Sequence, residues 1–156
     1  MKFRYRLQGA GWAYAELSDR GRRVTVQASY LSDALGDLLS ALVELTEGGR
    51  TATCLWAEEP AVVRWTFTAR YDGILCSMRR FPDEKAAATP PPHRYGTVIF
   101  TTTRPLPHLV AAVTDEVAGL RDRYCDDEYE RRWQAASFPS RRLDQLQEWL
   151  RRPVPS

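Results

Sequence analysis

The residues VVRWTFTARYDGILCSMRRF (62–81) contain the strongest local folding signal of the chain. Two β-rich runs flank the dipeptide Asp72-Gly73, which is typical of a two-residue hairpin turn of the primed type. With Tyr71 opposite Ile74, this turn predicts the inward pairs Ala69 with Cys76 and Phe67 with Met78. The opposite face then carries arginine, threonine and serine, so we expect one face to be core and the other to meet water.

Strand patterns lie on both sides of this hairpin. Residues 3–17 alternate in polarity and predict one long strand, bulged at Gly9-Ala10-Gly11, and the turn 18–21 leads to a second strand over 24–30. Residues 51–57 and 97–103 predict two further strands, and Glu58-Glu59-Pro60 forms the turn before residue 62. The hairpin is therefore one part of a larger antiparallel meander.

Helical spacing predicts the remaining elements. Ser32 is placed to cap a helix whose apolar positions run from Leu35 to Val43, and Gly48-Gly49 ends it. A long helix starts at Pro105 and extends to Tyr124, and a short one lies around residues 143–150. The leucine stripe of the first helix is expected to supply the centre of the core.

These elements predict an α+β fold with a mostly antiparallel sheet of about six strands, in the order ββαββββαα, and helices packed on one face. We expect residues 1–156 to form a single domain, because no linker separates two cores. Residues 82–96 contain three consecutive prolines and predict an exposed loop. Residues 152–156 are expected to form a frayed tail.

Composition limits the classes of protein to which the chain can belong. It has 156 residues, of which 44% are hydrophobic and 27% charged, with no apolar run that predicts a signal peptide or a membrane span. Three scattered cysteines predict neither a disulfide nor a zinc site, and we expect no metal or cofactor. Arg is abundant and Asn absent, which suggests a GC-rich genome, and a cytoplasmic location is expected.

No Walker A, GxGxxG, HExxH or GxSxG motif is present, and no residue is predicted to be catalytic. Only His93 and His108 are near-neutral proton carriers, and both favour surface or helix-end roles. The acidic residues between Asp122 and Glu130 alternate with arginines and indicate a solvated, salt-bridged surface.

The candidate binding residues come from the polar face of the hairpin and from nearby turns. Six residues there are predicted to bind a ligand or partner: Arg64, Arg70, Arg79, Glu58, Glu59 and His93. The three arginines could contact nucleic acid, but the pair of stacking aromatic side chains that single-strand binders use is not evident. The sequence therefore favours a solvated face and does not favour nucleic acid as a partner.

Several segments together resemble small actinobacterial proteins, some encoded near polymorphic toxins, that are similar to immunity proteins. The resemblance lies in WAYAEL (12–17), YLSDALGDLL (30–39), WAEEP (56–60) and the spaced Tyr129, Trp133, Phe138-Pro139 and Leu143. It implies a stoichiometric, non-catalytic binder. It transfers no functional residues, because such families vary at their contact surfaces.

The sequence thus favours a non-enzymatic protein-binding module with an immunity-like or regulatory role and a protein partner, and a homodimer is possible through an open sheet edge. One alternative is a small-molecule-binding protein or enzyme, with a pocket between the sheet and the helix 35–43 and with His93 or Cys76 contributing. The other alternative is nucleic-acid binding through the arginine-bearing sheet face.

Overall fold

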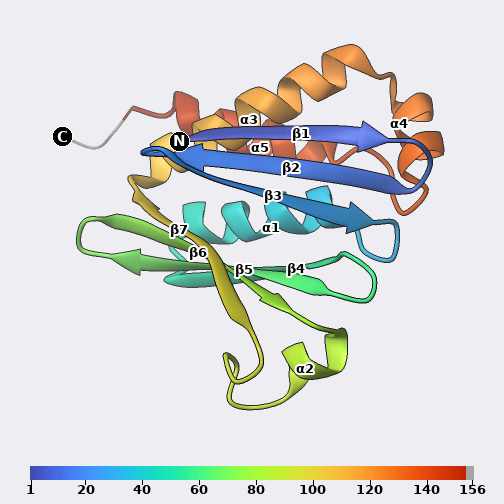
Figure 1. Cartoon of the computed structure of the whole chain (residues 1–156). Coiled ribbons are helices and arrows are strands. Elements are labelled where there is room, and N and C mark those ends of the chain that lie inside the picture. The colour runs from blue at the N-terminus through green and yellow to red at the C-terminus, as the bar shows by residue number, and fades with distance from the viewer. Residues whose placement is uncertain (154–156) are drawn as a thin grey trace.

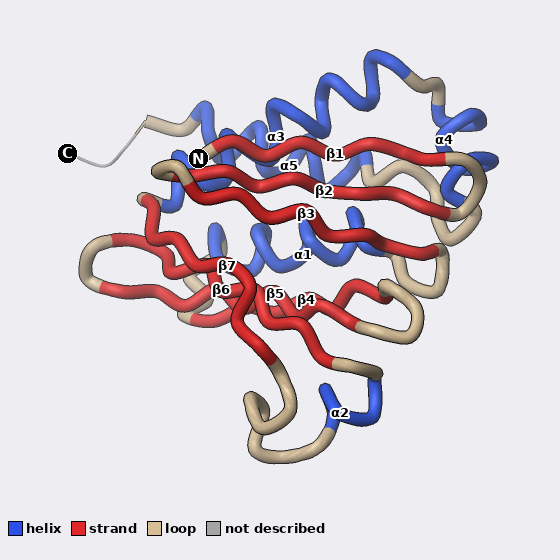
Figure 2. Tube along the Cα trace, in the orientation of Figure 1, coloured by secondary structure: helices blue, strands red, loops and turns tan. Residues whose placement is uncertain are grey.

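The computed structural model describes residues 1–153 and shows an α+β fold with seven strands in two antiparallel sheets and five helices (Figures 1 and 2). The predicted fold class is confirmed, although the strands form two sheets instead of one. In chain order the elements are β1 (Lys2–Gln8), β2 (Trp12–Asp19), β3 (Arg22–Ser29), α1 (Ala34–Thr46), β4 (Thr51–Ala57), β5 (Val62–Arg70), β6 (Gly73–Phe81), α2 (Glu84–Ala88), β7 (Thr97–Arg104), α3 (Leu106–Arg123), α4 (Asp126–Trp133) and α5 (Ser140–Arg151).

The first sheet has the strand order β1-β2-β3, and its first hairpin corrects the sequence-based expectation. Gly9 and Gly11 have φ values of 60° and 76° and reverse the chain, so that Phe3 lies opposite Leu17. The prediction of one bulged strand over residues 3–17 is therefore wrong. Alternating polarity is the same for a bulged strand and for a hairpin, and the two glycines supply the left-handed conformations that a tight reversal needs.

The second sheet has the order β4-β5-β6-β7, and the turn at its centre also differs from the prediction. Arg70 pairs with Gly73, so the turn residues are Tyr71 and Asp72, and Phe67 lies opposite Cys76 instead of Met78. A primed turn needs positive φ at its first central residue, whereas here Gly73, after the turn, has a φ of 138°. A shift of two residues leaves each side chain on its own face, so the predicted inward face is confirmed.

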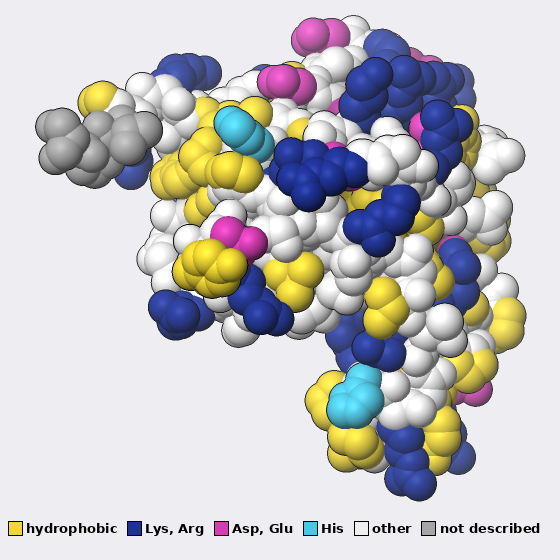
Figure 3. All heavy atoms as spheres, turned by 60° about the vertical axis from the view of Figure 1, so that its left-hand side comes forward, with side chains coloured by type: hydrophobic (Ala, Val, Ile, Leu, Met, Phe, Trp, Pro, Cys, Tyr) yellow, Lys and Arg dark blue, Asp and Glu magenta, His cyan; other side chains and the backbone are white. Residues whose placement is uncertain are grey.

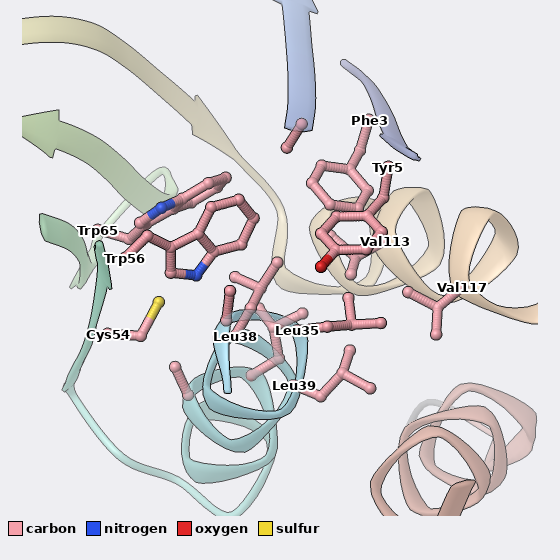
Figure 4. Packing of buried hydrophobic residues seen from close by; sticks show 14 of the residues in the cluster. Phe3, Tyr5, Leu35, Leu38, Leu39, Cys54, Trp56, Trp65, Val113 and Val117 are labelled. Carbon is pink, nitrogen blue, oxygen red and sulfur yellow. The ribbon is translucent and has the colours of Figure 1, made fainter. Parts of the chain in front are cut away.

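Helix α1 supplies the centre of the core, as its leucine stripe predicts. Leu35, Leu38 and Leu39 are fully buried. Figure 4 shows them on α1 beside the aromatic side chains of the two sheets, where Trp56 and Trp65 lie next to Phe3 and Tyr5. The cap of this helix is Asp33 and not Ser32, because the Asp33 carboxylate accepts a hydrogen bond from the Gly36 amide at 3.2 Å.

Helices α1, α3 and α5 lie behind the strands in Figure 1, on the inward side of the sheets. α3 packs along β1, and α5 packs against both α1 and α3. The smaller helix α4 contacts β1 and β2 and buries Tyr129 and Trp133. This arrangement leaves the outward faces of both sheets largely to solvent.

The Pro-rich segment 82–96 contains a short helix that the sequence analysis did not predict. In α2, Ala87 is buried against Val62 and Phe81 on the outward face of the second sheet, although most of the segment is exposed. The Asp83 carboxylate caps α2 by accepting a hydrogen bond from the Ala86 amide at 2.7 Å. Of the predicted frayed tail 152–156, residues 154–156 lie outside the described residues.

Candidate functional site

Arg64, one of the predicted binding residues, holds the segment 82–96 against the second sheet. Its Nη1 donates to the Pro92 carbonyl at 2.7 Å and its Nη2 to the Ala87 carbonyl at 2.5 Å. The guanidinium carbon lies 4.8 Å from the centre of the Phe81 ring, within the range of a cation–π contact. Arg64 is thus half-buried and uses its donors within the chain.

The other two arginines of this face have different surroundings. Arg79 lies opposite Arg64 in the β5–β6 pair, and its Nη1 donates to the Gly96 carbonyl at 2.9 Å. Arg70 is exposed at the end of β5. The structure brings Arg64 and Arg79 together at the foot of the Pro-rich segment and leaves Arg70 at the other end of the strand.

The two predicted acidic binding residues, Glu58 and Glu59, also have different surroundings. The Glu58 carboxylate accepts from Arg80 Nε at 2.7 Å and Nη2 at 3.0 Å, and from the Gln27 amide at 3.1 Å. These bonds connect β3 to the second sheet. Glu59 is exposed in the turn with a φ of 54°.

His93 and Cys76 lie on opposite sides of the second sheet. His93 is exposed in the segment that packs on the outward face, whereas Cys76 is buried on the inward face, where burial raises the pKa of its thiol to about 12. Leucine and tryptophan side chains fill the space between this sheet and α1. The two residues are therefore not brought together in one pocket.

A hollow of about 450 Å³ does lie beside α1, at its rim, between this helix and strand β4. One wall consists of α1 side chains at helical spacing, which are Asp37, Ser40, Ala41 and Glu44. The other wall consists of Thr53, Cys54 and Leu55 of β4, with Arg64 beyond them. The hollow is therefore a groove with one helical and one extended wall, and we name it the β4 groove.

The strand wall of the β4 groove is a free sheet edge. β4 pairs only with β5 among the described strands. The Glu58 amide donates a hydrogen bond to the Ala61 carbonyl, and the Ala69 amide donates one to the Arg50 carbonyl. Because backbone groups alternate in direction along an antiparallel strand, the even-numbered residues of β4 point theirs toward β5. The amide and carbonyl groups of Thr53 and Leu55 therefore point outward, at the groove.

The helical wall carries negative charge. Asp37 and Glu44 are exposed, and within residues 1–153 neither has an ion-pair partner within 4.0 Å. Partial burial raises the pKa of Asp37, and the charge of Asp33 raises it further, while Arg142 acts in the opposite direction. Since the Arg64 donors are used by backbone carbonyls, the groove presents carboxylates and unpaired strand groups together.

Among the residues of this groove, only Arg64 was predicted from the sequence to be a binding residue. Asp37, Ser40 and Glu44 do show helical spacing opposite the leucine stripe, but that pattern is also typical of an ordinary solvated helix face. Alternation showed which face of each strand is apolar. It does not show which strand lies at an edge, and that information decides where the groove forms.

Residues 1–153 lack the features of two other kinds of site. No group of three or more His, Cys, Asp or Glu side chains is arranged to hold a metal ion in residues 1–153. None of the helices in the same range is both long enough and apolar enough to cross a bilayer. Comparison of the chain with protein-family models, with curated proteins and with solved structures finds no match.

Proposed function

We propose that the protein is a non-enzymatic protein-binding module that takes up an extended segment of its partner as a fifth strand beside β4. The observation that carries this proposal is the β4 groove, in which a free strand edge and a polar helix face enclose about 450 Å³. Addition of a strand to a sheet edge is a recurrent mode of peptide recognition. Backbone hydrogen bonds supply affinity, and the wall beside the edge supplies specificity.

The groove dimensions fit this mode. Thr53 and Leu55 are two residues apart, so the incoming strand would exchange hydrogen bonds with both along about 7 Å of β4. α1 lies directly beside β4 and would contact alternate side chains of the added strand. The partner segment needs no fold of its own, only an extended conformation.

The charges of the groove define the chemistry of the partner. Asp37 and Glu44 are seven residues apart on α1, about 10 Å along the helix, and side chains on one face of an extended chain lie about 7 or 13 Å apart at spacings of two or four residues, on either side of that distance. A partner strand with Lys or Arg on the side that faces α1 would place cations beside both carboxylates. An acidic segment would be repelled.

The biological form of this binding is proposed to be immunity-like or regulatory. The resemblance of residues 12–17, 30–39 and 56–60 to immunity proteins supports a stoichiometric binder that acts by occupying its partner. Inhibition of a toxin encoded beside this gene would be the corresponding activity. A neighbouring toxin gene would support this form of the proposal, independently of the groove.

Selection from a phage-displayed library of random decapeptides tests the proposal. We expect the selected peptides to carry basic residues at alternate positions, and hydrogen exchange of the Thr53 and Leu55 amides to slow when such a peptide binds. Thr53→Pro removes one outward donor and should abolish binding without breaking a β4–β5 bond. Glu44→Lys should weaken binding at least about tenfold through like-charge repulsion.

Matched variants serve as controls. Thr101→Pro removes an outward amide from β7, at the opposite edge of the same sheet, since the Thr101 carbonyl accepts from Arg22 and so faces away from β6. Glu148→Lys makes the same charge change on α5. Both should bind like the wild type, and peptides that bind equally well to Thr53→Pro would show that the β4 edge is not the binding site.

A further inference from the structure

A second surface, on the outward face of the first sheet, has the opposite charge. By strand register, Lys2, Arg4 and Arg6 of β1 lie on the same face as Tyr14, Glu16 and Ser18 of β2 and Arg23 of β3. In Figure 1 these three strands lie in front of the helices, and no other element of the described chain crosses them. We call this surface the basic sheet face.

The positive charge of this face is concentrated in a small part of the chain. Residues 1–31 contain six basic and two acidic side chains, a net charge of +4, whereas the whole chain carries +2. One of the two acids, Asp19, is buried and bonded to Arg104. The other, Glu16, lies 3.7 Å from Arg23. Figure 3 shows Lys and Arg side chains over the upper half of the molecule, where several acidic side chains also lie.

A hollow extends the basic sheet face at the β2–β3 turn. It has a volume of about 390 Å³, and the residues that line it include the basic Lys2, Arg20, Arg22 and Arg23. The buried Asp19 carboxylate contributes to its floor but is occupied by Arg104 and Thr102. Cations grouped around a concave surface form the electrostatic footprint that a polyanion requires.

Aromatic side chains lie among these cations. Trp12 and Tyr14 are two residues apart on β2, half-buried, with their side chains on the basic sheet face about 7 Å apart along the strand. β2 is the central strand of the sheet, so cations from β1 and β3 flank the two rings. Single-stranded nucleic acids are bound by this combination, in which bases stack on aromatic rings and phosphates contact Arg and Lys.

We infer that the basic sheet face binds single-stranded nucleic acid, with Trp12 and Tyr14 stacking on bases and Lys2, Arg4, Arg6 and Arg23 contacting phosphates. The combination of rings and cations favours this ligand over an acidic protein, which would use the charges but not the stacking surface. Polar side chains at Gln8, Thr25 and Gln27 add hydrogen-bonding groups beside the rings. This site is separate from the β4 groove, which carries acidic residues.

Fluorescence anisotropy with labelled twelve-nucleotide oligo-U and oligo-dT tests the inference. Four phosphate contacts predict that the logarithm of the binding constant falls with the logarithm of salt concentration with a slope of about −3. The double variant Arg4→Ser/Arg6→Ser should halve that slope. Tyr14→Leu should weaken binding about tenfold and leave the slope unchanged, because stacking releases no counterions.

The control Arg70→Ser/Arg94→Ser makes the same charge change at exposed positions outside this face and should bind like the wild type. Ultraviolet crosslinking of the unmodified protein gives an independent measurement, and the crosslinked base should be found on tryptic peptide 7–20. Absence of binding at low salt would overturn the inference. Equal binding of poly-glutamate, together with an unaffected Tyr14→Leu variant, would also overturn it and identify the face as a surface for acidic proteins.

Discussion

Among single residues, Asp19 has the most strongly perturbed carboxylate with a clear structural role. It lies at the end of β2, and its side chain is 5% exposed. Its carboxylate accepts hydrogen bonds from Nε of Arg104, at 2.9 Å, from Nη2 of the same residue and from the Thr102 hydroxyl. The hydrogen bonds from Arg104 hold the pKa of Asp19 well below its usual range, although burial opposes them. Because Arg104 and Thr102 belong to β7, this carboxylate joins the two sheets.

We expect Asp19→Asn to lower the free energy of unfolding by about 2–3 kcal/mol at pH 7, because it leaves a partly buried guanidinium without its counter-charge. A depressed native pKa stabilises the fold above the unfolded pKa, and that stabilisation is lost as pH falls toward the native pKa. The difference between wild type and variant should therefore shrink below about pH 4. Urea unfolding between pH 7 and pH 2.5 measures it, with the exposed Asp115→Asn as control.

The three cysteines differ in burial, and we expect them to differ in reactivity for that reason. Cys54 and Cys76 are buried, and burial raises the pKa of both thiols, whereas Cys125 is exposed before α4. Since the thiolate is the reactive form, we expect Ellman's reagent to label one thiol in the folded protein and all three after unfolding. Cys125→Ser should remove the label from the folded protein, and rapid labelling of that variant would contradict the assignment.

At the scale of elements, the Pro-rich segment 82–96 depends on two β-sheet arginines for its position. Arg64 and Arg79 donate to its backbone carbonyls, and Ala87 supplies its buried apolar contact. Extended prolines cannot make the usual ladder of backbone bonds, so side-chain donors take the place of the missing amides. This explains how a segment without periodicity keeps a defined position.

We expect Arg64→Met to release the segment without unfolding the protein, since it removes two charge-assisted hydrogen bonds and retains the apolar stem. Trypsin cleavage at Lys85 and Arg94 should accelerate about tenfold or more, which corresponds to a loss of about 1.4 kcal/mol of local stability. Mass spectrometry of timed digests measures the two rates. Arg70→Met, on the same strand but at its exposed end, should leave them unchanged.

At the scale of the whole molecule, one apolar cluster contains residues from both sheets and from helices α1, α3, α4 and α5. α1 lies in this cluster with its leucines packed beside both groups of aromatic rings, which also contact each other (Figure 4). The two sheets have few close backbone contacts with each other compared with those inside each sheet. Their mutual position therefore depends on α1, on the edge-to-face contacts of Phe3 with Trp65 and of Tyr5 with Trp56, and on the links made by Asp19 and Glu58.

We expect Leu39→Ala, at the centre of this cluster, to lower the free energy of unfolding by about 2–5 kcal/mol through lost burial and a residual cavity. Because the core is shared, both sheets should unfold together. Tryptophan fluorescence and far-ultraviolet circular dichroism should then give coincident urea transitions for wild type and variant. The control is Thr25→Ala on the outward face of β3, which leaves the core intact. A variant such as Ala118→Gly on α3 would not serve, because it also lowers helix propensity.

Charge is also distributed at the scale of the whole molecule. The acidic side chains of the β4 groove lie beside the second sheet, and the cations of the basic sheet face lie on the first. A net charge of +2 conceals this separation. The two proposed ligands therefore have opposite charge requirements and should bind at the same time without competition.

Local patterns in the sequence predicted much of the architecture. The alternation in residues 62–81 and the leucine spacing in residues 35–43 depend on the geometry of strand and helix, so the inward residues Phe67, Cys76 and Leu39 could be identified directly. Two of the errors occurred at turns. A bulge and a hairpin at Gly9–Gly11, or a turn placed one residue earlier at Tyr71, preserve the same alternation and differ only in backbone conformation.

By itself, then, the sequence determined the α+β class, the inward faces of the strands and the helix that forms the core, since burial of apolar surface follows local periodicity. Only the tertiary structure decided that the strands divide into two sheets, that β4 keeps a free edge beside Asp37 and Glu44, and that Trp12 and Tyr14 share a face with Arg4 and Arg6. Among the described strands, those that pair follow each other along the chain, whereas β3 and β4, on either side of α1, do not pair. That break, and the way the faces are then covered, depends on packing between distant segments, and no property of an isolated segment specifies it.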